Sequence, residues 1–140
     1  MEIKVVETDQ ELQDAFQVRQ SVFVEEQKVP AELEIDEHEN EAVHFIAYDH
    51  ARPVAAGRFR TLEGMAKIER ICVLGSYRRT GLGQMLMKEI ERCANELKLG
   101  KLKLNAQVSA VGFYKKLGYH IISEEFMDAG IPHITMTKDL

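Results

Sequence analysis

The stretch RRTGLGQMLMKEIERC, residues 78–93, places two glycines at the point where a long helix has to begin. Over residues 82–97 apolar side chains recur at spacings of three and four, which predicts an amphipathic helix that ends at Gly100. A glycine inside a helix costs about 0.5–1 kcal/mol relative to alanine. Gly81 and Gly83 are therefore expected to serve the turn that starts the helix.

A glycine-lined turn from a strand into a helix can bind an anion. The first amides of a helix have no partner within it, and they carry about half a positive charge. Gly81 and Gly83 would let the backbone approach phosphoryl oxygens, while Arg78 and Arg79 add positive charge at the rim. The alternative is a turn that only starts the helix, and the glycines alone do not separate the two.

The spacing excludes two common phosphate-binding loops. After Gly81-Leu82-Gly83 come Gln84, Met85 and Leu86, so the third glycine of a GxGxxG loop and the GK[ST] ending of a P-loop are both missing. What fits is Arg-x-x-Gly-x-Gly directly after a strand that ends in residues 71–73. This pattern resembles the coenzyme A loop of the GCN5-related N-acetyltransferases, the GNAT superfamily.

Other segments strengthen this resemblance over most of the chain. AVGFYKKLGY, residues 110–119, resembles the closing motif of the family, and the two motifs together are specific. VRQSVFVEEQ, residues 18–27, and GIPHITM, residues 130–136, are similar to a small bacterial branch, the ElaA-like proteins.

The periodicity predicts strands and helices that alternate along one domain, residues 1–140. Thr8 and Glu11 have the spacing of a capping box, which predicts a helix from there to about Val24. The other expected elements are strands over 2–7, 43–49, 54–61, 67–74, 101–108, 119–126 and 133–137, and helices over 82–100 and 109–117. This order predicts an α/β (α+β) layered fold with a mixed sheet. The GNAT resemblance implies a mostly antiparallel sheet, flanked by helices, whose central parallel strands 67–74 and 101–108 splay apart.

The resemblance implies acetyl-CoA as the cosubstrate and assigns residues to it. The backbone of Ile71, Cys72 and Val73 would pair with the pantetheine arm. Gln107 occupies the position, seven residues before Tyr114, where the family often has an asparagine, and its longer amide would contact the cofactor. The pyrophosphate would be held by the loop formed by Arg78, Arg79, Thr80, Gly81, Leu82, Gly83 and Gln84.

Three residues are candidates for the chemistry. Tyr114 occupies the position of the tyrosine that protonates the departing thiolate in many members of the family, and the Val73 amide is expected to face the thioester oxygen. An alkyl ammonium with a pKa near 10 must lose a proton at a cost of about 4 kcal/mol, so a base is needed. Glu69, four residues before Val73 and expected on the same strand face, is the candidate base. Its alternative is a glutamate paired with Lys67 or an arginine.

The resemblance thus implies an N-acetyltransferase in which a primary amine attacks acetyl-CoA directly. The amine is a small molecule or a lysine side chain. A non-catalytic module that binds acyl-CoA as a sensor is the alternative from another class. A ping-pong route, in which Cys72 would carry the acetyl group, is the less favoured mechanism, because a small residue inside an apolar strand usually serves packing.

Composition excludes several other classes. The net charge of −5 argues against a nucleic-acid binder, and no apolar run approaches the ~20 residues of a membrane span. Cys72 and Cys93 stand outside any metal-binding pattern, and neither they nor the five scattered histidines predict a metal site. The opening residues lack a secretory signature, so we expect a cytoplasmic protein. A homodimer is left open.

An acidic run precedes the first hairpin. Between Glu25 and Glu41 eight carboxylates face the single Lys28. This run predicts attraction of a positively charged acceptor amine, with a solvated acidic loop as the alternative. His133, in an Ile-Pro-His turn, is expected either to line the acceptor pocket or to order the last hairpin.

Overall fold

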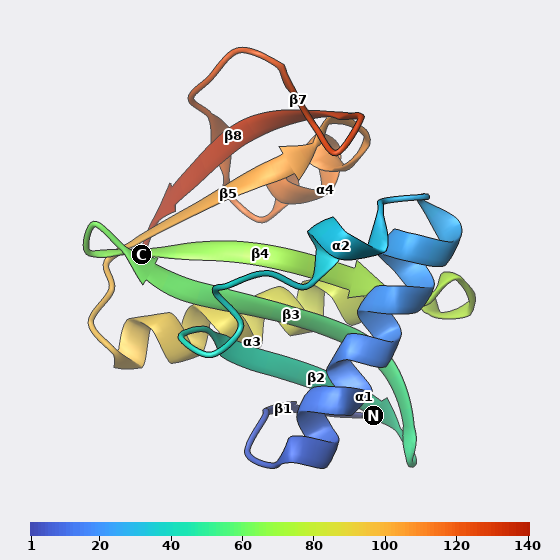
Figure 1. Ribbon diagram of the computed structural model, residues 1–140. Coiled ribbons are helices and arrows are strands. Elements are labelled where there is room, and N and C mark those ends of the chain that lie inside the picture. The colour runs from blue at the N-terminus through green and yellow to red at the C-terminus, as the bar shows by residue number, and fades with distance from the viewer.

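One mixed sheet runs through the chain, which the computed structural model describes from residue 1 to 140 (Figure 1). The strands lie in the order β1-β2-β3-β4-β5-β8-β6, and β7 pairs with β8. All neighbours are antiparallel except β4 and β5. The strands are β1 (Glu2–Val5), β2 (Val43–Asp49), β3 (Arg52–Leu62), β4 (Met65–Val73), β5 (Lys101–Gln107), β6 (His120–Ile121), β7 (Phe126–Asp128) and β8 (Ile131–Asp139).

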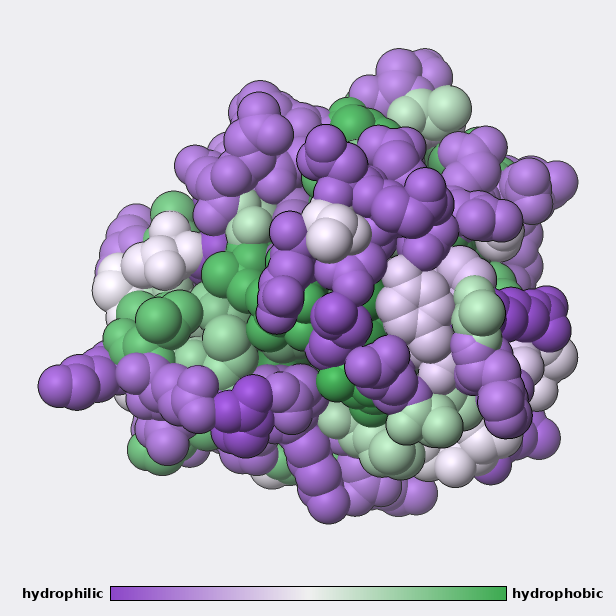
Figure 2. Space-filling model, turned by 90° about the horizontal axis from the view of Figure 1, so that it is seen from below, coloured by the Kyte–Doolittle hydropathy of each residue, from purple (hydrophilic) through white to green (hydrophobic).

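Helices cover both faces of this sheet (Figure 1). They are α1 (Asp9–Arg19), which continues as the π-helix η1 (Gln20–Glu26), then α2 (Ala31–Glu34), α3 (Leu82–Glu96) and α4 (Val111–Lys116), with short 3-10 turns η2 (Gly75–Tyr77) and η3 (Val108–Ala110). None of these helices combines the length and the apolar character needed to cross a bilayer. The surface seen from below is mainly hydrophilic, with apolar side chains in a band across it (Figure 2).

Local sequence explains where α1 begins. The Thr8 hydroxyl accepts a hydrogen bond from the Glu11 N–H at 3.1 Å, and the Glu11 carboxylate accepts one from the Thr8 N–H at 3.1 Å. These reciprocal bonds form the predicted capping box. The helix extends to the expected region, but its last seven residues, Gln20–Glu26, are π-helical.

Two apolar clusters hold the helices on the sheet. The larger one joins α3 and α4 to one face and includes Leu86, Ile90 and Leu104. The smaller one joins α1 and η1 to the other face and includes Val18, Val22 and Cys72. The two faces are called here the α3 face and the α1 face.

The predicted single strand over residues 119–126 is wrong, because β6 and β7 are two short strands separated by an irregular segment. At the break, the Ser123 hydroxyl accepts the Thr135 N–H at 2.8 Å. A side chain therefore replaces the backbone partner that a continuous strand would have supplied.

A bulge in β4 changes which residues share a face. Ala56 lies opposite Cys72, but Arg58 lies opposite Glu69, so β4 has one residue more than β3 over this interval. The extra length is taken up at Arg70, whose φ is 61°. Across such a bulge, side chains no longer point alternately to the two faces of the sheet.

Candidate active site

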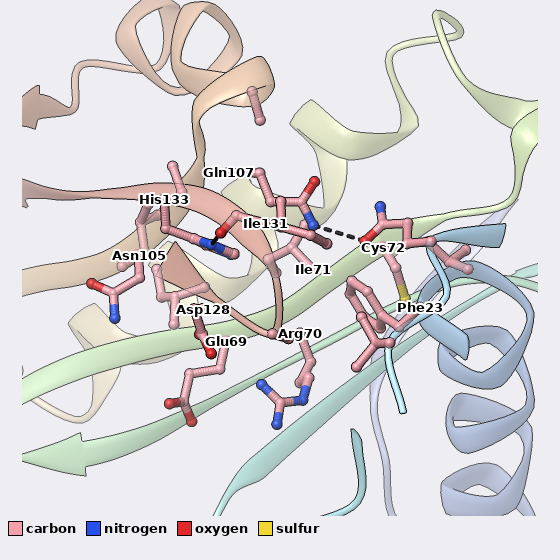
Figure 3. A pocket seen from close by; sticks show the side chains of 18 of the residues that line it. Phe23, Glu69, Arg70, Ile71, Cys72, Asn105, Gln107, Asp128, Ile131 and His133 are labelled. Carbon is pink, nitrogen blue, oxygen red and sulfur yellow. Dashed lines mark hydrogen bonds between the residues drawn. The ribbon is translucent and has the colours of Figure 1, made fainter. Parts of the chain in front are cut away.

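The parallel strands β4 and β5 separate before they end. Their pairing stops at Ile68 opposite Leu104, although β4 continues to Val73 and β5 to Gln107. The predicted splay is thus confirmed. A cavity of about 440 Å³ occupies the gap, and Figure 3 shows side chains from both strands and from the β7–β8 hairpin around it.

The lining of this cavity comes from both faces of the sheet. Val73 and Tyr114 belong with the packing on the α3 face. Cys72 packs against α1, and Phe23 of η1 lines the cavity from the same side. Since one space touches both groups, the cavity passes through the sheet between β4 and β5. Side chains of both sheet faces therefore line the same space.

The Val73 peptide faces this gap. Opposite residues in an antiparallel pair alternate between those that exchange backbone hydrogen bonds and those that do not. The Leu74 N–H donates to the Val54 carbonyl at 2.9 Å, so Val73, opposite Ala55, turns its N–H and C=O away from β3. Arg78 Nε donates to the Val73 carbonyl at 3.0 Å. The Val73 N–H remains a donor directed at the opening.

The glycine turn leaves the start of α3 exposed. Gly81 is the N-cap residue with φ 87°, no side chain caps the helix, and a Cβ at Gly81 would meet nothing within 4 Å. The first bond of the helix runs from the Met85 N–H to the Gly81 carbonyl at 3.1 Å. The N–H groups of Leu82, Gly83 and Gln84 therefore have no partner within the helix.

Gly83 has a separate reason to be glycine. A Cβ there would lie 3.3 Å from the Phe113 ring and 3.9 Å from a Val73 methyl group. The start of α3 thus packs directly against α4 and the end of β4. Leu82, predicted as a loop residue, has a buried side chain, so only its backbone is available to a ligand.

The two arginines of the loop differ. Arg78 forms an ion pair with Glu26 of η1 at 2.6 Å, in addition to its bond to the Val73 carbonyl. The side chains of Arg79 and Thr80 are exposed, and the Thr80 hydroxyl donates to the Tyr77 carbonyl at 2.6 Å. Arg78 therefore joins the loop to the wall of the cavity.

Tyr114 is buried in the cavity wall on the α3 face. Its ring packs edge-on against Phe113 at 5.0 Å and Tyr119 at 5.8 Å between centroids. Burial raises the pKa of the Tyr114 hydroxyl above its ordinary value of 10.0. The hydroxyl therefore keeps its proton at neutral pH and is available as an acid.

Glu69 does not share a face with Val73, and that prediction is wrong because of the bulge at Arg70. Val73 packs toward α3, whereas Glu69 contacts Arg58 at 2.9 Å, Arg60 at 3.1 Å and Lys67 at 3.6 Å. Burial alone would raise the pKa of Glu69, but these neighbouring cations bring it below its usual 4.5. The pairing with Lys67 and arginines, the alternative from sequence, is what the structure shows.

Three carboxylates of the acidic run point into the protein. Arg19 contacts Glu34 at 2.6 Å and Glu39 at 2.7 Å, and Arg58 contacts Asp36 at 2.9 Å and Glu39 at 2.7 Å. Both arginines are 1% exposed. The expectation that the run as a whole offers its charge to a partner is wrong for these three, because they neutralise buried arginines.

Cys72 is buried on the α1 face, at the wall of the cavity. Its thiol lies 3.7 Å from the Ala56 carbonyl, and burial raises its pKa to about 12. A thiol that stays protonated at neutral pH is a poor nucleophile. The contacts of Cys72 thus fit a packing residue. Cys93 is likewise a free thiol.

The amide side chains near the gap have partners within the protein. Gln107 donates to Gln27 at 2.8 Å, which connects β5 to the end of η1 across the cavity (Figure 3). Asn105 accepts from the Thr135 hydroxyl at 2.8 Å. No cluster of three or more potential metal ligands is present.

Asp128 and His133 both line the cavity, although no sequence motif pointed to Asp128 and His133 was expected either there or in the order of the last hairpin. They reach it through the β7–β8 hairpin, which folds back over the gap (Figure 3). The spacing of these residues gave no signal, because the pairing of β8 with β5 places His133 opposite Gln107 and the pairing of β7 with β8 places Asp128.

The sequence model of the acetyltransferase (GNAT) domain matches residues 6–140. The chain belongs to the GNAT acetyltransferase family. It is 52% identical over 140 residues to the uncharacterized N-acetyltransferase YjcF of Bacillus subtilis (strain 168), over 99% of this chain and 100% of that protein.

Solved structures agree with this assignment. An acyl-CoA N-acyltransferase from Pseudomonas aeruginosa has a TM-score of 0.89 and 28% identity over 99% of both chains. Escherichia coli ElaA has a TM-score of 0.87 and 26% identity, also over 99% of both chains. The second likeness supports the ElaA-like branch of the GNAT family.

Proposed function

We propose that this GNAT protein transfers an acetyl group from acetyl-CoA to a primary amine by direct attack. The observation that carries the proposal is the cavity between β4 and β5, which is lined by side chains of both sheet faces and by Arg78 of the loop that leads to the uncapped start of α3. A cofactor on the α3 face and an amine on the α1 face would meet there without a covalent enzyme intermediate.

The cofactor would be held mainly by backbone groups. The free N–H groups at the start of α3 and the positive end of its dipole suit a diphosphate, with Arg79 as the exposed charge beside it. The pantetheine arm would run along Ile71–Val73, whose edge is unpaired because β5 has diverged. This placement would direct the thioester carbonyl at the Val73 N–H.

The chemistry requires an oxyanion donor and an acid on the cofactor side. The Val73 N–H would stabilise the negative charge on the carbonyl oxygen, and Tyr114 would protonate the thiolate as the carbon–sulfur bond breaks. Glu69 remains on the acceptor side with its negative charge held by three cations. In this position it suits electrostatic attraction of an ammonium group better than removal of its proton.

Two measurements test the proposal. Purified protein is incubated with acetyl-CoA and a panel of small amines and lysine peptides, and released thiol is recorded. Turnover with at least one amine is expected. Tyr114→Phe should lower kcat by about 10²-fold or more and leave coenzyme A affinity unchanged. Saturable coenzyme A binding without turnover by the unmodified protein would instead identify an acyl-CoA sensor.

A further inference from the structure

His133 lies on the side of the cavity where the amine would enter. It stands on β8 directly opposite Gln107 of β5, so the two side chains share a sheet face. Figure 3 shows His133 beside Asn105 and Asp128, across the opening from Phe23, with Glu69 on β4.

A hydrogen bond determines which ring nitrogen of His133 carries the proton. Nδ1 lies 2.7 Å from the Ile131 carbonyl oxygen. A carbonyl oxygen can only accept, so Nδ1 bears the hydrogen and the neutral ring keeps its lone pair on Nε2. The ring stacks on Phe126 with centroids 6.1 Å apart and an interplanar angle of 25°. These contacts hold the imidazole in one orientation.

The other side chains around the cavity that could accept a proton are paired with arginines or buried. Glu69 Oε1 accepts hydrogen bonds from Arg58 and Arg60. Glu34 is bound by Arg19 at 2.6 Å. The Cys72 thiol is fully buried.

Asp128 and Tyr114 also line the cavity. Asp128 is exposed at the hairpin turn, where it can attract a cation but lies in water. Tyr114 lies on the α3 face, where the leaving thiolate would form. His133 Nε2 is therefore the oriented and unengaged proton acceptor on the acceptor side.

We propose that His133 is the catalytic base that removes the proton from the acceptor ammonium, an inference that rests on the proposed acetyl transfer. Nε2 takes one proton from R–NH3⁺, and the free amine forms a bond to the thioester carbon. The carbon–sulfur bond then breaks, Tyr114 protonates the thiolate, and the second amine proton returns to Tyr114 through solvent. The imidazolium finally releases its proton to water, so one proton leaves per acetyl group transferred.

The test uses His133→Asn, which keeps an N–H that can reach the Ile131 carbonyl but has no basic nitrogen. We expect kcat to fall by about 10²-fold or more, with coenzyme A affinity and melting temperature unchanged. His133→Ala should lose activity to a similar extent and regain part of it in millimolar imidazole. His120→Asn is the matched control, because His120 is exposed on β6 outside the cavity and should keep full activity.

Each outcome bears on the proposal. Undiminished kcat in His133→Asn, or loss of kcat in His133→Ala that imidazole does not restore in a folded protein, overturns the role of His133 while leaving the acetyl transfer intact. If the unmodified protein turns over no amine, the proposed function fails first. Nitrogen-15 NMR of the imidazole then still decides the geometry: the Nδ1–H form is expected, and the Nε2–H form would contradict the assignment.

Discussion

The guanidinium of Arg58 on β3 lies 2.9 Å from the carboxylate of Glu69 on β4, and the same buried guanidinium holds Asp36 and Glu39 from the acidic run. Arg58 thus joins the central strands to the segment that covers the α1 face. Burial opposes charging of Arg58, but its hydrogen bonds to Asp36 and Glu39 raise its pKa above the ordinary 12.5. Its charge is therefore permanent.

Removing this charge should destabilise the fold. Arg58→Met leaves three carboxylates without their shared partner, and breaking a buried ion pair on one side costs about 3–5 kcal/mol. Urea denaturation measures the free energy of unfolding. Arg58→Lys keeps the charge but not the paired hydrogen bonds, so its free energy of unfolding should fall by less than that of Arg58→Met. A change of less than about 1 kcal/mol in Arg58→Met would contradict the structural role of the network.

The same network predicts loss of stability in acid. Burial would raise the pKa of Glu39, but hydrogen bonds from Arg19 outweigh it and lower the pKa from 4.5 to about 2. Because the pKa of Glu39 is lower in the folded protein, the stability that its ionised carboxylate contributes is complete above about pH 4.5. This stability is lost as the pH falls toward 2. Thermal melting between pH 6 and pH 2 should show the decline. Glu39→Gln should be less stable at pH 6 and lose less on acidification; an equal decline in both proteins would count against the assignment.

The glycine turn gives a prediction about cofactor binding. In Gly81→Ala the residue must keep φ near 87°, which costs about 1–2 kcal/mol for an alanine, so the loop should shift and coenzyme A affinity should fall about tenfold. Gly64→Ala is the matched control, since Gly64 has φ 77°, equally open surroundings and no place in the cavity. Calorimetric titration with coenzyme A measures both. Equal affinity in the two variants would remove the turn from the binding site.

Cys72 provides a test of the direct mechanism. Its buried thiol, with a pKa of about 12, should not accept an acetyl group. Cys72→Ala is therefore expected to keep most of its turnover, and mass spectrometry after incubation with acetyl-CoA alone should detect no acetyl-cysteine. An acetylated Cys72 peptide would establish a ping-pong route instead.

Several features follow from short-range patterns and could be predicted. Thr8 and Glu11 cap α1 as their spacing indicates, because capping needs only neighbouring backbone groups. Gly81, with φ 87°, marks the turn at the start of α3, since φ preference is a property of the residue itself. Gly83 lies inside the helix, where its lack of a side chain serves the packing against Phe113. The separation of β4 from β5 was implied by the family resemblance and is confirmed by their pairing.

Other features depend on which strands meet. The bulge at Arg70 turns Glu69 away from Val73, and no residue type in the sequence marked it, because a non-glycine residue was expected to continue the alternation. The pairing of the acidic-run carboxylates with buried arginines could not be predicted for a related reason. These carboxylates bind Arg19 and Arg58, and the paired residues are 15 to 22 positions apart in the sequence.

Residues within a few positions of one another were enough to predict most of the element order, the turn at Gly81 and the tyrosine motif, but not the break between β6 and β7. Only the tertiary structure decided what those groups face. Strand pairing placed His133 beside Gln107 and a bulge paired Glu69 with cations, and these are long-range contacts whose geometry local preferences do not encode.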